Sequence, residues 1–362
     1  SLGFSSGLTG LIDGSLATVP RTALGAYSTL SPWESGDGTQ TSITHMLSGN
    51  FTKLAGAHSM KFGIDARLYR AFQNRFPQAV SPDFSFSNAW TRGPLDNSPT
   101  PPIGLELATM LFGIPGGSMN RAANSAMQGN YTGLYFHDDW KLTRTFTLNY
   151  GIRYERESPI TERYDRLNGA FDSVTPNPVE AQAKVNYAKS PIAELPVSEF
   201  SALGGLTFVN AGGLDRSPYE TETNNFLPRI GFSWAVLPKT VVRGGYGIFY
   251  DLVGINRATA RQTGFSQSTP IQASLDNGLT FLVSNANPFR NGLLPPLGAS
   301  GGLTTNLNQG FTVYPDKRLN GYAQRFSLGL QQQVGELLLE ATYLGNRGTR
   351  LLVNRGINNT PN

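Results

Sequence analysis

The sequence contains no cysteine among its 362 residues. This absence excludes disulfides, thiolate metal ligands and cysteine nucleophiles together. Charge is also scarce, because Asp, Glu, Lys and Arg make up 15% of the chain, against roughly 25% in an average soluble protein. The net charge of +4 is scattered along the sequence and forms no basic block or stripe, so we expect no nucleic-acid partner.

Long hydrophobic runs are missing too. No stretch approaches the roughly 18 consecutive apolar residues of a transmembrane helix. The first residues, SLGFSSGLTG, lack the charged start of a signal peptide, so we expect either a mature chain or a piece of a longer one. The signatures H-E-x-x-H and G-x-S-x-G are absent as well. We therefore expect a protein that is not an enzyme and that needs no cofactor.

The residues that are abundant indicate β-structure. Glycine accounts for 41 positions, tyrosine for 14 and phenylalanine for 21, without the excess of Ala, Glu, Lys and Leu that helical proteins show. The stretch 131–155 shows the pattern most clearly. Its second half places apolar or aromatic residues at every even position: Phe146, Leu148, Tyr150, Ile152 and Tyr154. Small or polar residues fill the odd positions, which predicts a strand with two unlike faces.

Four hairpins of this kind follow one another, at 43–70, 131–155, 230–251 and 322–344. The strands of the second hairpin run for about 11 residues, the length that a tilted strand needs to cross a bilayer. In each hairpin only a few residues are left for the turn. The sequence therefore predicts eight strands with short turns inside each hairpin.

The segments between the hairpins are long. They cover 71–130, 156–229 and 252–321 and are rich in Pro, Gly, Asn and Ser. Loops beyond about 12 to 15 residues are unusual in a compact soluble domain, whereas short turns alternating with long loops are typical of outer-membrane barrels. Within these loops, 103–112 could form a short amphipathic helix or a further strand, and 279–283 is another apolar run; we expect both in the outer part.

Alternation alone does not decide which face is wet. On a soluble sandwich the apolar face packs into a core, whereas on a membrane barrel it meets lipid and the polar face lines the lumen. The loop pattern favours the barrel. The aromatic residues that share the apolar face then form interfacial girdles and lipid-facing wall, and a sugar-stacking platform is the alternative. These residues are Trp140, Tyr150, Tyr154, Trp234, Tyr246 and Tyr250.

Four motifs carry a resemblance to a known family. The first hairpin contains HSMKFGIDAR, the second reads YTGLYFHDDWKLTRTFTLNYGIRYE, the third contains NNFLPRIGFSWAVLPKTVVRGGYGIFYD, and the fourth contains QRFSLGLQQQVGELLLEATYLGNRGTRL. Together they span about 41–353. They resemble the barrel hairpins of TonB-dependent outer-membrane receptors, especially the Oar-like group common in acidobacteria.

The resemblance implies a fold, a location and partners. It implies an antiparallel transmembrane β-barrel in the bacterial outer membrane, with short periplasmic turns and long extracellular loops. Such receptors carry a plug domain and a TonB-coupling segment and close a barrel of about 22 strands. We find neither of these parts here and expect residues 1–362 to be an internal segment of the barrel, without its ends. The implied partners are outer-membrane lipid, the TonB complex through N-terminal parts not in this sequence, and an unidentified large solute such as a siderophore or glycan.

Two other functions stay open at this stage. A surface or adhesive barrel could use the same loops to bind matrix or other cells without transport. A soluble β-sandwich that binds carbohydrate would show the same strand alternation.

Charged residues on the polar strand faces are the candidates for contact with a solute. Arg153, Glu155, Arg243 and Asp251 fall on these faces, near the expected outer ends of their strands. They could line the lumen and contact a solute or the plug. The alternative, which we favour, is a set of cross-strand ion pairs that stabilise the wall.

Two further motifs suggest chemistry that strand geometry disfavours. His137, Asp138 and Asp139 could bind a metal or act as acid and base, but alternation places Asp138 on the opposite face from the other two. A structural role near the periplasmic rim is therefore favoured. The stretch from Arg243 to Gly247 contains RGG and G-x-G, yet a phosphate-binding loop must lead into a helix, and the IFYD that follows is strand-like.

Overall fold

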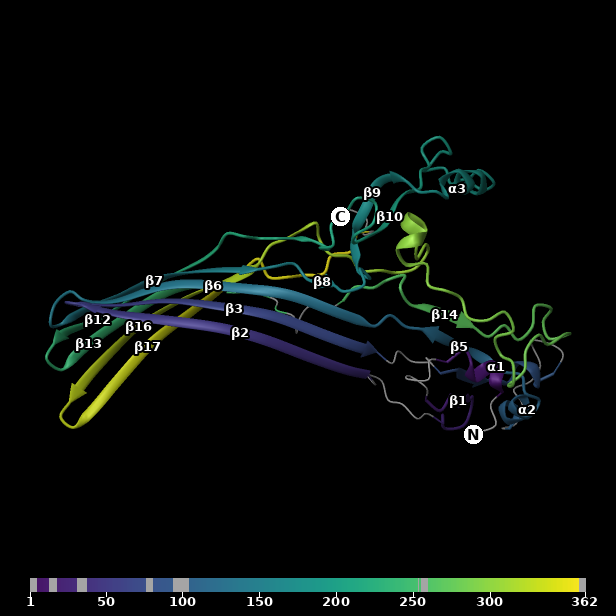
Figure 1. The fold of residues 1–362 in the computed structure, drawn as a ribbon, viewed down its shortest axis with the longest axis horizontal. Coiled ribbons are helices and arrows are strands. Elements are labelled where there is room, and N and C mark those ends of the chain that lie inside the picture. Colours follow the sequence, from purple (N-terminus) through teal and green to yellow (C-terminus); the bar gives the residue numbers. More distant parts are fainter. Residues whose placement is uncertain are drawn as a thin grey trace.

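The computed structural model describes residues 5–12, 18–30, 38–75, 81–93, 104–252, 254 and 260–357. A long, curved antiparallel sheet forms most of the molecule (Figure 1). Its strands are β2 (Gly38–Ala55), β3 (His58–Arg75), β6 (Ser125–Lys141), β7 (Phe146–Glu157), β12 (Asn225–Leu237), β13 (Thr240–Asp251), β16 (Gly321–Val334) and β17 (Leu337–Thr349). They pair in the order β17-β16-β13-β12-β7-β6-β3-β2, and β8 (Thr161–Glu162) adds a short pairing to β6. The four predicted hairpins are confirmed as four consecutive strand pairs.

The tight turns all lie at one end of the sheet (Figure 1). The turn between β2 and β3 is Gly56-Ala57, and the turn between β16 and β17 is Gly335-Glu336. Both glycines have positive φ, +60° and +62°, which two-residue hairpin turns require because their twist must match that of the strands. The long connections are gathered at the opposite end, as the sequence predicts for an outer-membrane barrel.

The apolar face of the sheet is exposed rather than sealed under a second layer. Ile152 is 47% exposed, Ile230 54% and Leu328 55%. Phe146, Leu148, Phe232 and Ile248 are partly covered, by neighbours on the same face such as the stacked rings of Phe146 and Phe232, whose centroids are 6.2 Å apart. A soluble sandwich would bury these side chains, so the surface that they form is suited to lipid.

The sheet extends further at its outer end than alternation predicts. Strand β3 continues to Arg75 and β6 begins at Ser125, so the second strand pair starts well inside the segment expected to be loop. The reason is visible in the directly opposed residues Ala71 and Met127, which are 0% and 2% exposed on the lumen side. Loops pack there, and a strand that is apolar on both faces loses the two-residue period.

The loops have secondary structure and cores of their own. A small sheet has the order β1-β4-β5-β14, formed by Arg21–Leu24, Asp83–Phe86, Gly116–Arg121 and Gln267–Pro270. Two further pairs join β9 (Asn168–Pro176) to β10 (Leu203–Phe208) and β11 (Glu220–Thr221) to β15 (Lys317–Arg318). The helical elements are α1 (Ser6–Thr9), η1 (Asn88–Trp90), α2 (Leu105–Leu111), α3 (Glu180–Tyr187) and η2 (Gly298–Thr304). Among the described residues, no helix has the length and hydropathy needed to cross a membrane.

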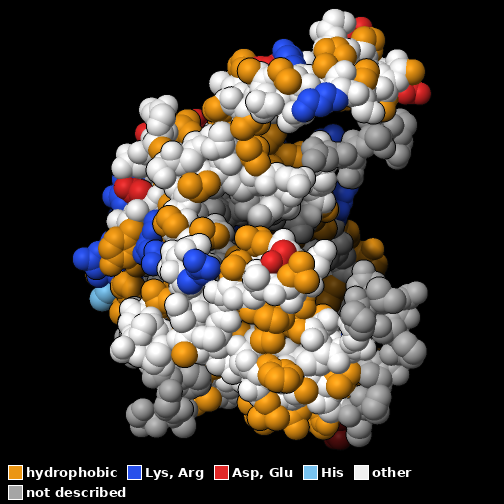
Figure 2. Space-filling model, turned by 90° about the vertical axis from the view of Figure 1, so that its right-hand side faces the viewer, with side chains coloured by type: hydrophobic (Ala, Val, Ile, Leu, Met, Phe, Trp, Pro, Cys, Tyr) orange, Lys and Arg blue, Asp and Glu red, His pale blue; other side chains and the backbone are white. Residues whose placement is uncertain are grey.

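Two buried clusters hold these loops. One packs over the lumen side of β3 and β6 and consists of Ala71, Met127, Ile160, Leu167, Val209, Tyr219 and Ala260. The other lies around the small sheet and consists of Leu8, Phe84, Phe86, Met119, Ile271, Phe289 and Leu293. Figure 2 looks onto the loop end of the molecule and shows hydrophobic side chains spread over this face, with several Lys and Arg side chains together at the left of the view. The loops that carry these two clusters are therefore folded, and we call them, at the end of the sheet opposite the tight turns, the outer cap.

The two apolar loop segments behave differently from each other. Of the alternatives for 103–112, the described part forms the helix α2. Its predicted apolar side packs only in part: Met110 contacts the cluster around the small sheet, whereas Leu107 and Leu111 are 42% and 80% exposed. Glu106 and Thr109 are buried instead. The run 279–283 forms neither helix nor strand, and only Val283 packs against a core cluster.

Candidate lumen-facing site

Cross-strand register groups the polar-face residues into rungs, by which we mean rows of directly opposed residues across the sheet. The predicted residues Arg153 and Glu155 occupy neighbouring rungs on β7. Asp251 is the last residue of β13, at its outer end, opposite Gly321. Arg243 is on the polar face, but its predicted outer position is wrong: β13 begins at Thr240, directly after the short turn. Eight residues, about 27 Å of strand, separate Arg243 from Asp251. The four residues therefore do not form a single site.

A network centred on Arg153 joins three strands. Its Nε donates to Oε1 of Glu155 at 2.6 Å, and its Nη2 donates to the hydroxyl oxygen of Tyr131 at 2.7 Å. The same guanidinium lies 3.5 Å from a carboxylate oxygen of Asp65, which also pairs with Arg67 at 2.6 Å. The Tyr131 hydroxyl donates to Glu155 at 2.8 Å. Of these ion pairs, only Arg153–Asp65 joins two strands, whereas Arg153–Glu155 and Arg67–Asp65 each lie within one strand.

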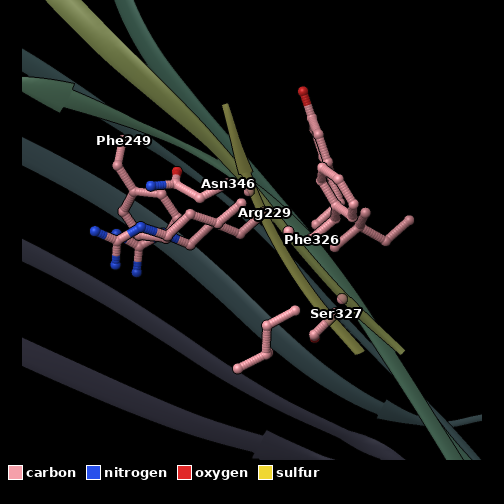
Figure 3. A pocket seen from close by; sticks show the side chains of 12 residues that line it. Arg229, Phe249, Phe326, Ser327 and Asn346 are labelled. Atoms are coloured by element: carbon pink, nitrogen blue, oxygen red, sulfur yellow. The ribbon is translucent and has the colours of Figure 1, made fainter. Parts of the chain in front are cut away.

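A second group, on β12, β13 and β16, contains two arginines and one aromatic ring. The guanidinium carbon of Arg229 lies 4.7 Å from the ring centroid of Phe249, and that of Arg325 lies 5.1 Å from it. Both distances are within the range of cation–π attraction. Figure 3 shows Arg229 and Phe249 against each other with Asn346 beside them, while Phe326 points to the other side of the sheet. These residues line a hollow of about 520 Å³.

Gly247 explains how the ring reaches its place. It lies directly opposite Arg229 on one side and Arg325 on the other. A Cβ at this position would lie 3.1 Å from the Phe249 ring and 3.4 Å from Cγ of Arg229. Because glycine has no side chain, the ring of Phe249 folds back over it and lies between the two arginines. The G-x-G motif is therefore a packing feature inside a continuous strand, and no helix follows it before Asp251.

Charge on the lumen face is layered along the strands. One rung contains the basic residues Lys61, His137, Arg229 and Arg325. The next rung out contains Tyr135 and Arg153, and the one after it contains Asp65 and Glu155 on either side of Gly133. Phe249 and Asp251 lie beyond Gly247, the last residue of β13 that pairs with β12 at the outer end. Arg67 lies one rung further out again than Asp65, opposite Tyr131, so basic and acidic residues alternate along this face.

The side chains of His137 and Asp139 lie on one face of the sheet and that of Asp138 lies on the other, as alternation predicts. The Nε2 atom of His137 lies 2.9 Å from Oδ1 of Asp139 on the lumen face. Asp138 points to the apolar face, where it contacts His58 and Tyr150. In the part of the chain that the structure describes, no group of three His, Cys, Asp or Glu residues could hold a metal ion.

Four of the six predicted aromatic residues of the apolar face lie near the ends of their strands, and Tyr150 and Tyr246 lie in the middle of β7 and β13. Trp140 and Trp234 lie close to the tight turns, and Trp140 stacks on His58 with ring centroids 5.0 Å apart. Tyr154 and Tyr250 lie at the outer ends, where Tyr250 contacts Tyr322 at 5.5 Å. This distribution is the one expected for interfacial girdles, and it places the rings on the face opposite the lumen.

Outside the strands, local hydrogen bonds and burial shift two ionisable groups. Hydrogen bonds from the side chain and backbone of Thr280 and from Ser274 lower the pKa of the Asp276 carboxyl to about 2. Burial raises the pKa of Tyr314 to about 12. Tyr314 packs against Tyr219, which belongs to the buried cluster over β3 and β6. The Arg261 guanidinium carbon lies 4.9 Å from the centroid of the Tyr314 ring. Both groups fix loop structure at the outer end.

Sequence reasoning missed Arg229 and Phe249 as site residues. Their signal was available, since Arg229 shares the odd-numbered face with Gly231 and Ser233, and Phe249 is an aromatic residue on the otherwise small face of its strand. What the sequence lacks is the register between β12, β13 and β16, which brings Arg325 into the same rung.

Comparison with known proteins agrees with the architecture. Residues 2–362 match the family described as the outer membrane beta barrel domain. No curated protein matches the sequence. Similar solved structures include three bacterial receptors or transporters, each with low identity. The chain spans under a third of the length of each of them.

The three structures are similar to this chain as follows. The alcaligin outer-membrane receptor FauA from Bordetella pertussis is 10% identical with a TM-score of 0.34, over 87% of this chain and 30% of the receptor. The FrpB iron transporter from Neisseria meningitidis is 13% identical with a TM-score of 0.36, over 88% and 31%. The ferric-catecholate import receptor Fiu from Escherichia coli is 13% identical with a TM-score of 0.31, over 84% and 31%.

An exposed apolar face, a charged opposite face and tight turns at one end define a membrane β-barrel wall. The chain belongs to the outer membrane beta barrel domain family. It is a protein of the bacterial outer membrane.

Proposed function

We propose that this chain forms wall and outer loops of a TonB-dependent outer-membrane receptor that imports a large solute. The observation that carries the proposal is that the sheet does not close on itself and that its lumen face carries charged residues. Within the described residues, the edge strands β2 and β17 each pair with one neighbour only. Eight strands closed on themselves would leave room only for side chains or one small ligand. An open sheet of eight strands instead fits a section of a barrel with many more strands.

The parts that would complete the receptor lie outside these residues. A wide barrel needs further strands, a plug to seal it and a segment that engages TonB. We infer that other residues of the full-length protein supply them, and that residues 1–362 are an internal section of the wall. The four hairpin motifs further favour the Oar-like group. In this role the chain binds and passes a solute, such as a siderophore or a glycan, and performs no chemical step.

The outer cap supplies the first contact with the solute in this proposal. Its exposed apolar side chains include Leu111 at 80%, Phe112 at 73% and Leu279 at 86%. Such side chains on a folded cap suit binding to a large ligand. They would equally serve a surface barrel that adheres without transport, so the cap alone does not favour one role.

Binding to TonB separates the two roles. The test is to purify the full-length protein from outer membranes and measure binding of the periplasmic domain of TonB, with an unrelated porin as the control. A receptor binds this domain, and the porin does not. Heat-modifiable migration in unboiled gels verifies that the barrel is folded. A folded full-length barrel that shows no binding to TonB would overturn the transport proposal and favour the adhesive role.

A further inference from the structure

The lumen-facing group of Arg229, Phe249 and Arg325 has a charge that its surroundings leave uncompensated. Both arginine side chains are exposed, and among the described residues neither forms an ion pair. Other lumen arginines behave differently, because Arg67 pairs with Asp65 and Arg153 pairs with Glu155. Cation–π attraction to Phe249 holds the two guanidinium groups in position without neutralising them.

The spacing of the two cations suits one bound group. Each guanidinium carbon is about 5 Å from the same ring centroid, so the two lie no more than about 10 Å apart. Two like charges at this separation repel each other, and an anion bound at the edge of the ring relieves the repulsion. Each guanidinium also presents a planar set of N–H donors that matches carboxylate and phosphate oxygens.

The group lines a hollow with a volume of about 520 Å³. Gly245, Ser327 and Asn346 also line it. Figure 3 shows the Asn346 side chain on the same side as Arg229 and Phe249. Its amide and the Ser327 hydroxyl add neutral donors beside the guanidinium groups.

We propose that Arg229, Phe249 and Arg325 form a binding site for a solute that carries a carboxylate or phosphate group, with the arginines as ligands and the ring as their spacer. The inference rests on the proposed function in one respect, namely that the lumen is the path of a solute. The neighbouring basic residues Lys61 and His137 already face Asp139, at 3.9 Å and 2.9 Å. The anion site is therefore confined to the two arginines with free charge.

The test uses the full-length protein in detergent, with citrate and inorganic phosphate as separate probes in titration calorimetry at low ionic strength. We expect saturable binding that weakens as salt is raised. Replacing both arginines, in R229Q/R325Q, should weaken binding about tenfold or more, because charge-assisted hydrogen bonds are lost. Phe249→Leu should weaken it to a smaller degree, since the arginines remain but are no longer held.

Arg243→Gln is the matched control. Arg243 is an exposed lumen-facing arginine on β13, the strand that carries Phe249. It lies about 14 Å from Gly247 along this strand. This variant should keep the affinity of the unchanged protein within about twofold, and heat-modifiable migration should show that all variants are folded. Absence of binding by the unchanged protein, or equal weakening by R243Q and R229Q/R325Q, would overturn the site. The measurement needs no TonB, so its failure is distinguishable from failure of the transport proposal.

Discussion

The Nδ1 atom of His58 lies 2.6 Å from Oδ2 of Asp138, which joins the first residue of β3 to the turn end of β6. Tyr150 of β7 donates its hydroxyl to the same carboxylate oxygen at 3.0 Å. Asp138 is 1% exposed although it points to the apolar face, where Trp140 stacks on His58. A carboxylate on this face is tolerable only because these groups surround it. The cluster therefore fastens three strands together next to the tight turns.

Removing this carboxylate should destabilise the barrel. Asp138→Ala leaves His58 and Tyr150 without their shared acceptor, and we expect a loss of about 1 to 3 kcal/mol in the free energy of unfolding. The measurement is urea unfolding of the full-length protein, followed by heat-modifiable gel migration. Glu336→Gln, in an exposed tight turn, is the control and should change the free energy by less than about 0.5 kcal/mol. Equal unfolding midpoints for the two variants would show that the cluster has no stabilising role.

The two sequence-predicted arginines should differ in their effect on stability. Arg153→Ala removes the partner of Glu155 and Tyr131, and Arg153 is only 19% exposed in its side chain. We expect a cost of about 1 to 3 kcal/mol, because polar groups are left unpaired in a partly buried site. Arg243→Ala removes an exposed side chain and should cost less than about 0.5 kcal/mol. The same urea experiment compares them, and a larger cost for Arg243 would contradict the assignment of the network.

Asp276 should titrate far below the usual range of an aspartate. Its pKa in the folded protein is about 2, against the ordinary value of 3.8 for a carboxyl without these hydrogen bonds. Because the folded pKa is the lower one, the stabilising contribution is present above about pH 4 and is lost as the pH falls through 2. Thr280 donates its amide to this carboxylate at 2.9 Å, so its amide proton shift reports the titration.

The measurement is a pH series of the Thr280 amide resonance, with Asp276→Asn as the control that abolishes the titration. A midpoint near 2 is the expected result. A midpoint at the ordinary value of 3.8 would mean that the hydrogen bonds from Thr280 and Ser274 do not hold the carboxylate.

The hairpins and their two faces could be predicted because side-chain alternation is local. Phe146 to Tyr154 carry the pattern within one strand, and no partner strand is needed to recognise it. The outer ends of the same strands could not be predicted. At Ala71 and Met127 the lumen face packs against loops, and a strand buried on both faces no longer alternates.

The outer cap and the arginine site depend on relationships that a single sequence does not contain. Strand β5 pairs with β14, which brings Arg121 opposite Gln267 from a segment far away in the chain. The site likewise requires the registers that place Arg229, Gly247 and Arg325 in one rung. A shift of one residue in either register would turn one arginine toward the lipid. This is why the residues could be recognised individually while their grouping could not.

The face of Leu328 and its neighbour Ser327 gives the most direct test of the account. Residues 1–362 contain no cysteine, so Leu328→Cys and Ser327→Cys each provide a single labelling site within them, on β16. We expect a fluorophore at position 328 to be quenched by nitroxide-labelled lipid and one at position 327 to be quenched by aqueous iodide, because adjacent strand residues face opposite sides. Quenching of the label at 328 by iodide, with no quenching by the labelled lipid, would contradict the assignment of the apolar face to the membrane.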